Sequence, residues 1–229
     1  KGISVNSIIA KALPITAKLG GVAFVFSMVT GIVLGIIAAL SKRQWVQNSV
    51  MIFATVGVSV PSFLYALMLM TVFGVILQWL PFIGLKTPLH YILPAFSLSL
   101  CPISMVARLV RSSMTEAMKQ DYMVLAKSKG TSPIKLIVKH ALKNCLIPVV
   151  TYAGPLVAYL MTGSFVIESI FSIPGLGGEF VTSVTNRDYP LIMALTIFFG
   201  AFIIFTNLVS DLLTAMIDPR IKLEKRKAA

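Results

Sequence analysis

The sequence predicts an all-α membrane protein with several bilayer-spanning helices, and composition and hydropathy carry that prediction. Hydrophobic residues make up 57% of the 229 residues, charged residues only 12%, and the mean hydropathy is +0.89. A water-soluble domain could hardly cover so much apolar surface with polar side chains. The composition therefore excludes a soluble enzyme, and a count of two Cys excludes a disulfide-stapled scaffold.

The third observation is a set of five apolar stretches in the sequence, each near or above the roughly 20 residues that a helix needs to cross a bilayer. Their approximate bounds are residues 17–40, 50–80, 91–110, 146–167 and 191–217. Together these stretches predict a single transmembrane domain over residues 1–229.

The first two stretches carry local features that constrain their helices. In residues 17–40, Gly31 and Gly35 form a Gly-x-x-x-Gly pair, which we interpret as a close helix-packing contact. Residues 50–80 are too many for one straight crossing, and Pro61 within them removes a backbone hydrogen bond. A kinked or strongly tilted helix is therefore expected in the second stretch.

The basic residues are distributed unequally between the two sides of the predicted membrane. Five crossings place the chain ends on opposite sides, and of the 20 Lys and Arg residues 15 then fall on the side of the C-terminus and 5 on the other. Cytoplasmic loops carry the excess of Lys and Arg, so the C-terminus is expected in the cytoplasm. The net charge of +12 therefore reflects topology, and nucleic acid is not expected as a partner.

Polar residues inside the predicted spans are few and mostly uncharged. Asp211 is the only acid in a predicted span, and its place near the end of the last one indicates a packing or helix-end partner rather than a proton relay. A hydroxyl-rich, Pro-interrupted translocation path is expected through the second, third and fourth spans. Its candidate residues are Ser59, Pro61, Ser62, Ser97, Ser99, Thr151, Tyr152 and Tyr159. Any single hydroxyl also fits a packing role, bonded to its own helix.

The longest polar segment, residues 111–145, predicts two helices joined by a Gly turn. Residues 116–129 have a helical apolar period, with Lys on the opposite face. The apolar residues of that period are Ala117, Met118, Tyr122, Leu125 and Ala126. Gly130 then fits a left-handed helix C-terminus, and Ser132 with Pro133 fits the start of a second helix. A basic amphipathic hairpin resting on anionic lipid remains an alternative interpretation.

The same segment resembles the cytoplasmic coupling loop of ABC importer permeases. The resemblance is carried by residues 121–130 and 140–148. Within them, Ala126, Gly130 and Pro148 match an Ala-x-x-x-Gly motif and a downstream Pro.

The resemblance is to the dipeptide, oligopeptide and nickel permeases within that family. The Glu-Ala that opens the loop motif in sugar permeases is Val124-Leu125 here. Three further segments are similar to the same group in order and spacing: residues 168–177, 186–190 and 218–220.

The resemblance implies a permease fold that normally has six spans, and therefore one more helix before the first residue of this chain. It implies a plasma or inner membrane location in a bacterium or archaeon, with membrane lipid around the spans. The implied partners are a homologous second permease, two cytoplasmic ATPases and an external peptide-binding protein. No Gly-x-x-x-x-Gly-Lys-Ser/Thr phosphate-binding motif occurs in the sequence, so ATP and Mg²⁺ are expected on the ATPases.

The resemblance also implies roles for individual residues. It assigns ATPase coupling to Asp121, Ala126, Lys129, Gly130, Ser132 and Pro133. An external gate or binding-protein contact falls to Glu168, Pro174, Gly175, Gly177, Arg187 and Asp188. Without the resemblance, residues 168–190 would be interpreted as a plain connecting loop.

The expected function is the permease subunit of an ATP-driven importer of oligopeptides or dipeptides, with no catalytic or metal-binding residues of its own. Nickel or another small solute is the alternative cargo, although His90 and His140 lie outside the predicted spans and no His, Cys or Met cluster lies within them. An intramembrane enzyme would need paired catalytic groups at membrane depth, which the sequence lacks. A non-transporting scaffold is the further alternative, but it would not need the Gly-punctuated hairpin.

Overall fold

The computed structural model describes residues 4–132, 135–162 and 165–217, and this part of the chain is helical without a strand. The longer helices are α1 (Val5–Leu40), α2 (Gln44–Ser59), α4 (Ile92–Met118), α8 (Ile147–Thr162) and α11 (Tyr189–Ile217). The shorter ones are α3 (Ser62–Leu69), α5 (Asp121–Ser128), α7 (Leu142–Cys145), α9 (Phe165–Ile170) and α10 (Leu176–Thr185). Further helical turns are η1 (Met70–Ile76), η2 (Pro88–Tyr91) and η3 (Leu136–Ala141).

Four helical segments in the described residues are long and apolar enough to cross a membrane, and α2 with α3–η1 makes a fifth if this bent pair counts as one span. The prediction of an all-α, multi-span protein is therefore confirmed. The bounds differ most at the first span, which begins at Val5 rather than near residue 17. This added length is stabilised by tertiary contact, because Ala12 packs with Leu176 of α10 and Leu195 of α11.

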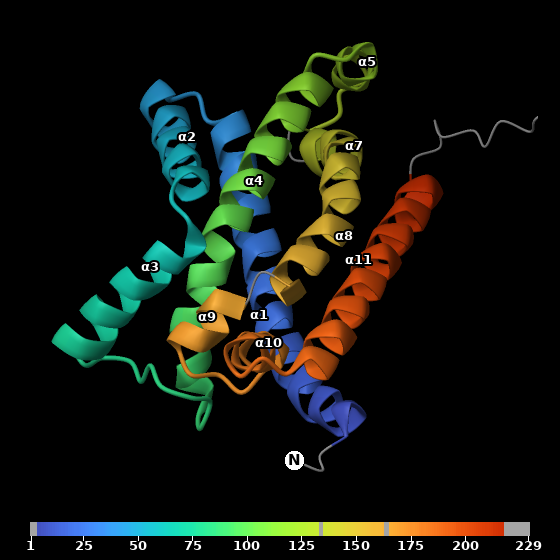
Figure 1. Ribbon diagram of the computed structural model, residues 1–229. Coiled ribbons are helices and arrows are strands. Elements are labelled where there is room, and N and C mark those ends of the chain that lie inside the picture. The colour runs from blue at the N-terminus through green and yellow to red at the C-terminus, as the bar shows by residue number, and fades with distance from the viewer. Residues whose placement is uncertain (1–3, 133–134, 163–164, 218–229) are drawn as a thin grey trace, which may run out of the picture.

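The centre of the molecule is the packing of α1 along α4, with α2 and α3 to one side and α8 and α11 to the other (Figure 1). The two helices approach closely because small residues line the contact. A Cβ atom on Gly31 would lie 2.7 Å from Cβ of Val106, and one on Gly35 would lie 2.6 Å from Cβ of Val110. The interpretation of the Gly-x-x-x-Gly pair as a packing contact is confirmed.

The second span is broken at Pro61, as expected, but it bends far more than a kinked helix. The axis turns by 100° between α2 and the α3–η1 segment, and helical structure ends at Ile76 rather than near residue 80. The Tyr65 hydroxyl donates a hydrogen bond of 2.8 Å to the Val56 carbonyl across the break. This bond helps to satisfy the backbone where the helix is interrupted.

The long helices share two ends of the molecule (Figure 1). One end holds the α1–α2 connection, α5 and the last turn of α11. The opposite end holds the first turns of α1, together with α9 and α10. We call the first the basic end, because Lys42, Arg43, Arg111, Lys119 and Lys129 lie there. The other is called the outer end.

Candidate functional site

The predicted coupling segment forms a hairpin at the basic end, which we define as residues 119–145. Helix α4 continues to Met118, so residues 111–118 belong to a long helix rather than to the loop. The single helix expected over residues 116–129 is wrong, because the chain turns at Lys119 and Gln120 before α5 begins.

This turn changes which side chains of α5 face the protein. Met123 is only 3% exposed and packs with Leu136 and Ala141 in the core beneath the hairpin. Val124 and Leu125 are 60% and 57% exposed. Leu125, one of the residues of the predicted apolar period, is therefore exposed, and a pair of neighbouring aliphatic side chains projects from the hairpin.

The other residues predicted for coupling surround this exposed pair. Asp121 begins α5, where a carboxylate interacts favourably with the helix dipole. Gly130 has φ of +74°, which confirms the predicted left-handed conformation. Lys129 and Ser132 are exposed, and Ala126 is half-buried.

Backbone hydrogen bonds close the hairpin around Gly130. The Ala126 carbonyl accepts a 3.3 Å bond from the Thr131 N–H, and the Ser132 carbonyl accepts a 2.9 Å bond from the Leu136 N–H. Pro133, the last residue predicted for coupling, lies outside the described residues.

Two of the serines predicted for the path are buried in helix packing instead. Ser97 and Ser99 are both fully buried, and each hydroxyl donates to a carbonyl one turn earlier in α4. The Ser99 hydroxyl also lies 3.1 Å from the Ala23 carbonyl of α1. The Ser99 hydroxyl therefore links α4 to α1, whereas the Ser97 hydroxyl bonds only within its own helix, and neither buried side chain is open to a path in the described residues.

Three further path candidates have separate surroundings. The Thr151 hydroxyl lies 3.1 Å from that of Thr214, so this residue faces α11. The Ser59 hydroxyl donates to the Thr55 carbonyl of its own helix but stays exposed. Tyr152 is half-buried between the two main apolar cores.

The remaining path candidates meet beside the broken span. Ser62, directly after Pro61, lies near the hydroxyl of Tyr159 on α8. Tyr159 is 37% exposed and therefore reaches open space. The sequence analysis missed Tyr65 at the same break, and its position four residues after Pro61 is the signal that could have found it.

At the outer end, Glu168 is the centre of a buried polar cluster. Its side chain is fully buried, and its Oε1 accepts a 2.8 Å hydrogen bond from the Thr16 hydroxyl of α1. Its Oε2 accepts a 3.0 Å bond from the Gly178 N–H. The Thr16 hydroxyl oxygen in turn accepts a 2.8 Å bond from the Leu176 N–H at the start of α10. We call Thr16, Glu168 and residues 175–178 the outer cluster.

Glu168 requires two corrections to the sequence-based expectations. It lies in the candidate span of residues 147–170, so Asp211 is not the only acid within a span. Its complete burial also means that the side chain is no surface contact for a binding protein. No sequence pattern indicated the role of Thr16, which lies 152 residues earlier in the chain.

The glycines after Glu168 are required by close packing around the carboxylate. A Cβ atom on Gly175 would lie 2.5 Å from Glu168 Oε2 and 2.5 Å from Thr16 Oγ1. One on Gly177 would lie 2.7 Å from Cα of Phe165. The segment that composition alone would make a plain loop thus contains α10 and is fixed to α1 and α9.

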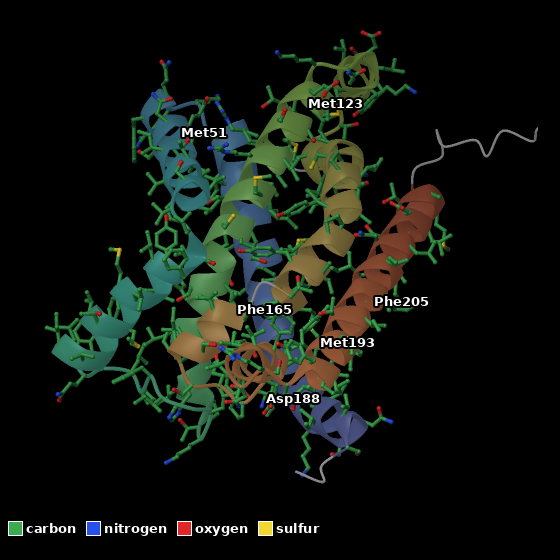
Figure 2. All side chains as sticks on the ribbon, in the orientation of Figure 1. Met51, Met123, Phe165, Asp188, Met193 and Phe205 are labelled. Atoms are coloured by element: carbon green, nitrogen blue, oxygen red, sulfur yellow. The ribbon has the colours of Figure 1, made fainter. Side chains whose placement is uncertain are left out.

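The other outer candidates lie on the surface. Pro174, Arg187 and Asp188 are exposed. Asp188 Oδ1 accepts a 3.3 Å bond from the Leu191 N–H and so caps the start of α11. In Figure 2, Asp188 lies at the opposite end of the molecule from Met123.

Comparison with known proteins decides the family. Residues 31–223 match the family described as the binding-protein-dependent transport system inner membrane component. The chain belongs to this family. It is 45% identical over 223 residues to the dipeptide transport system permease protein DppB of Bacillus subtilis, covering 97% of this chain and 72% of that protein. It is 43% identical over 224 residues to the oligopeptide transport system permease protein OppB of Haemophilus influenzae, covering 97% and 73%.

Solved structures agree on the fold of this transport permease. The chain superposes on a permease chain of the MetNI methionine ABC transporter, in inward-facing conformations, with a TM-score of 0.75. The match covers 92% of this chain and 96% of that chain at 14% sequence identity, so it shows the fold alone. This chain is therefore a transport permease subunit with an ABC importer permease fold.

Proposed function

We propose that this permease forms half of the translocation pathway of an ABC importer for dipeptides or oligopeptides. The second half is a homologous permease, and two cytoplasmic ATPases and an external peptide-binding protein complete the transporter. The names of the relatives, dipeptide and oligopeptide permeases at 45% and 43% identity, support the peptide cargo. The ATPases bind ATP and Mg²⁺ in this proposal.

The basic end faces the cytoplasm in the proposed topology. Every Lys and Arg of the α1–α2 connection and of the hairpin lies there, and cytoplasmic loops carry such an excess. The C-terminus then lies in the cytoplasm of a bacterial or archaeal cell, after the last turn of α11.

The observation that carries ATPase coupling is the exposed aliphatic pair on α5. Val124 and Leu125 stand 60% and 57% exposed on a short helix that is closed by the left-handed Gly130. Exposed apolar side chains on a rigid helix at the end of a molecule fit a groove on a partner protein. Docking of this helix on the ATPase would pass its motion to α4 and α8, between which the hairpin lies.

The test is the double substitution Val124→Ser with Leu125→Ser in the reconstituted complex. We expect loss of most binding-protein-stimulated ATP hydrolysis, because the two side chains are more than half exposed and their loss should disturb the hairpin itself little. Trp45→Ser is the matched control, since Trp45 is also apolar, 64% exposed and near the basic end, but lies on α2. Equal activity of the two variants would contradict the docking assignment.

The cargo is tested by uptake into proteoliposomes of the complex with its binding protein. We expect ATP-dependent uptake of labelled dialanine or a labelled pentapeptide, and none of labelled nickel. In the described residues no group of three or more His, Cys, Asp or Glu side chains is placed to hold a metal ion. Uptake of nickel without peptide would replace the peptide assignment with the alternative cargo.

For the path, the proposal assigns the open space beside the Pro61 break, where Ser62, Tyr65 and Tyr159 meet. Ser59, on the α2 side of the break, and Tyr152, two turns before Tyr159 on α8, are also assigned to the path in this proposal. At the outer end, the exposed Pro174, Arg187 and Asp188 are the proposed contact with the binding protein. The buried outer cluster beneath them is the proposed gate. The side chains assigned to the path carry hydroxyl and aromatic groups, and such groups suit a cargo of varied sequence.

A further inference from the structure

A cleft of about 670 Å³ lies between α2 and the basic-end half of α4 and takes no part in the function proposed above. Helix α2 contributes Met51 and Thr55 to its wall, and Figure 2 shows Met51 on the basic-end half of α2. Helix α4 contributes Arg108 and Arg111, and Lys119, the residue directly after the helix, completes the cations of the wall. Arg108 and Arg111 share one face of α4, because they are separated by three residues.

The cations of this α2–α4 cleft lack a counter-charge. Glu116 is the one acid in its wall, eight residues and about 12 Å along the helix from Arg108. Within the described residues neither Arg111 nor Lys119 makes an ion pair or side-chain hydrogen bond. Arg108 donates a 2.9 Å bond from Nη2 to the Thr55 hydroxyl, while its Nε is buried without a partner. The cleft therefore needs an anion from outside the described chain.

The position of the cleft indicates which anion supplies that charge. Arg108 lies inside the candidate span of residues 88–117, and Lys119 lies just beyond it, so in the proposed orientation the cleft lies at the cytoplasmic end of that span. A guanidinium at this depth is costly unless it is paired. Phospholipid phosphates lie at this boundary, and Arg binds phosphate through two parallel hydrogen bonds.

The neighbouring surface of α2 fits the rest of a lipid molecule. Ile52 and Val56 are 64% and 50% exposed, and they follow Met51 and Thr55 of the cleft wall along the helix. An acyl chain can lie on this aliphatic strip while its headgroup enters the cleft. A short soluble anion would leave the strip uncovered.

We propose that the α2–α4 cleft binds the phosphate of an anionic phospholipid in the cytoplasmic leaflet. The bound lipid neutralises Arg108 and Arg111 and holds the α2 part of the broken span against α4. This assignment rests on the membrane orientation proposed above. Basic pockets between transmembrane helices on the cytoplasmic side are a known place for such headgroups.

The test is native mass spectrometry of the full-length permease in its complex, delipidated and then titrated with dioleoylphosphatidylglycerol or dioleoylphosphatidylcholine. We expect Arg111→Gln with Lys119→Gln to weaken phosphatidylglycerol binding about 30-fold and to leave phosphatidylcholine binding unchanged. Lys42→Gln with Arg43→Gln is the matched control, because it removes two cations from the same end outside the cleft. This control should stay within about threefold of wild type.

A gain of binding keeps the test independent of folding defects. Glu116→Gln removes the one acid of the cleft wall and should tighten phosphatidylglycerol binding about fivefold. Equal losses in the cleft variant and its control would overturn the proposal, since the attraction would then be diffuse. No change in Glu116→Gln would overturn it as well.

Competition distinguishes the lipid from other anions. Displacement of phosphatidylglycerol by millimolar inorganic phosphate would overturn the proposal in favour of a soluble anion. Displacement by dialanine would overturn it in favour of the cargo carboxylate. Lipid binding is measured without transport, so a failure of the peptide assignment leaves this readout unaffected.

Discussion

The outer cluster and the hairpin are two short polar segments that the structure treats in opposite ways. In the outer cluster, Glu168 and Thr16 are fully buried and tie three segments together by hydrogen bonds of 2.8 to 3.0 Å. In the hairpin, Val124 and Leu125 are more than half exposed although they are apolar. The comparison teaches that burial here does not follow polarity. The outer cluster satisfies its polar groups within the described chain, whereas the hairpin leaves two apolar side chains exposed.

The largest expected effect is the loss of the buried carboxylate. Glu168→Ala leaves the Thr16 hydroxyl and the Gly178 N–H without their acceptor, and should lower the unfolding free energy by roughly 3 to 5 kcal/mol. Thermal unfolding of the complex in detergent measures the loss. Glu179→Ala, in the first turn of α10, is the control and should cost only about 0.3 to 1 kcal/mol. An equal loss of unfolding free energy in the two variants would show that Glu168 stabilises the outer end no more than Glu179 does.

The packing of the outer cluster is tested next, with a single added methyl group. Gly175→Ala places a Cβ atom 2.5 Å from Glu168 Oε2, and overpacking of this kind costs roughly 1 to 3 kcal/mol. Gly200→Ala on α11 is the matched control, because nothing lies within 4 Å of its added Cβ atom. Thermal unfolding should show a loss for the first variant and none for the second. If Gly175→Ala left thermal unfolding unchanged, the outer cluster would be able to shift and accommodate the added methyl group.

The hairpin is tested by a substitution that strains the backbone but brings no added atom against a neighbouring residue. Gly130→Val and Gly84→Val both put a β-branched residue at positive φ, +74° and +77°, where no neighbour lies within 4 Å of the added Cβ atom. Each should cost about 1 to 2 kcal/mol of stability. Only Gly130→Val should uncouple ATP hydrolysis from transport in the reconstituted complex. Uncoupling by both, or by neither, would contradict a special role for the hairpin.

The smallest expected effect concerns the thiol of Cys145, the last residue of the hairpin. Cys145 is fully buried, and burial raises its pKa from 9.0 to about 11, since it disfavours the thiolate. In a Cys101→Ser background, maleimide should not label the folded protein at pH 8, but should label it in SDS. Because the folded pKa is the higher one, this burial stabilises the fold below about pH 9 and the gain is lost as pH rises toward 11. Rapid labelling at pH 8 would show that the hairpin opens.

The sequence predicted an all-α chain with several spans, because apolar length and Pro placement are local signals. It placed the break at Pro61 and the left-handed turn at Gly130 for the same reason. It missed the first turns of α1, where Lys11, Pro14 and Lys18 interrupt the apolar run. Their helix is stabilised by packing on α10 and α11, which no local pattern contains.

The site was less predictable, since side-chain environment depends on tertiary contacts. A turn at Lys119 and Gln120 rotates α5, so Leu125 is exposed and Met123 is buried. Ser97 fitted a path as well as a packing role, and only the packing on α4 decides between them. The burial of Glu168 depends on a hydroxyl far away in the sequence, which composition could not indicate.

The Glu168–Thr16 contact also constrains the order in which the protein is assembled. Thr16 is synthesised 152 residues before Glu168, roughly 8 to 30 s earlier at ordinary rates of translation. A carboxylate entering a membrane span without a partner is costly to insert. Helix α1 should therefore already be inserted in the membrane when residues 147–170 leave the ribosome. Chains whose first span is inserted late or in the inverted orientation would expose the Glu168 carboxylate to lipid. We expect membrane proteases to degrade such chains.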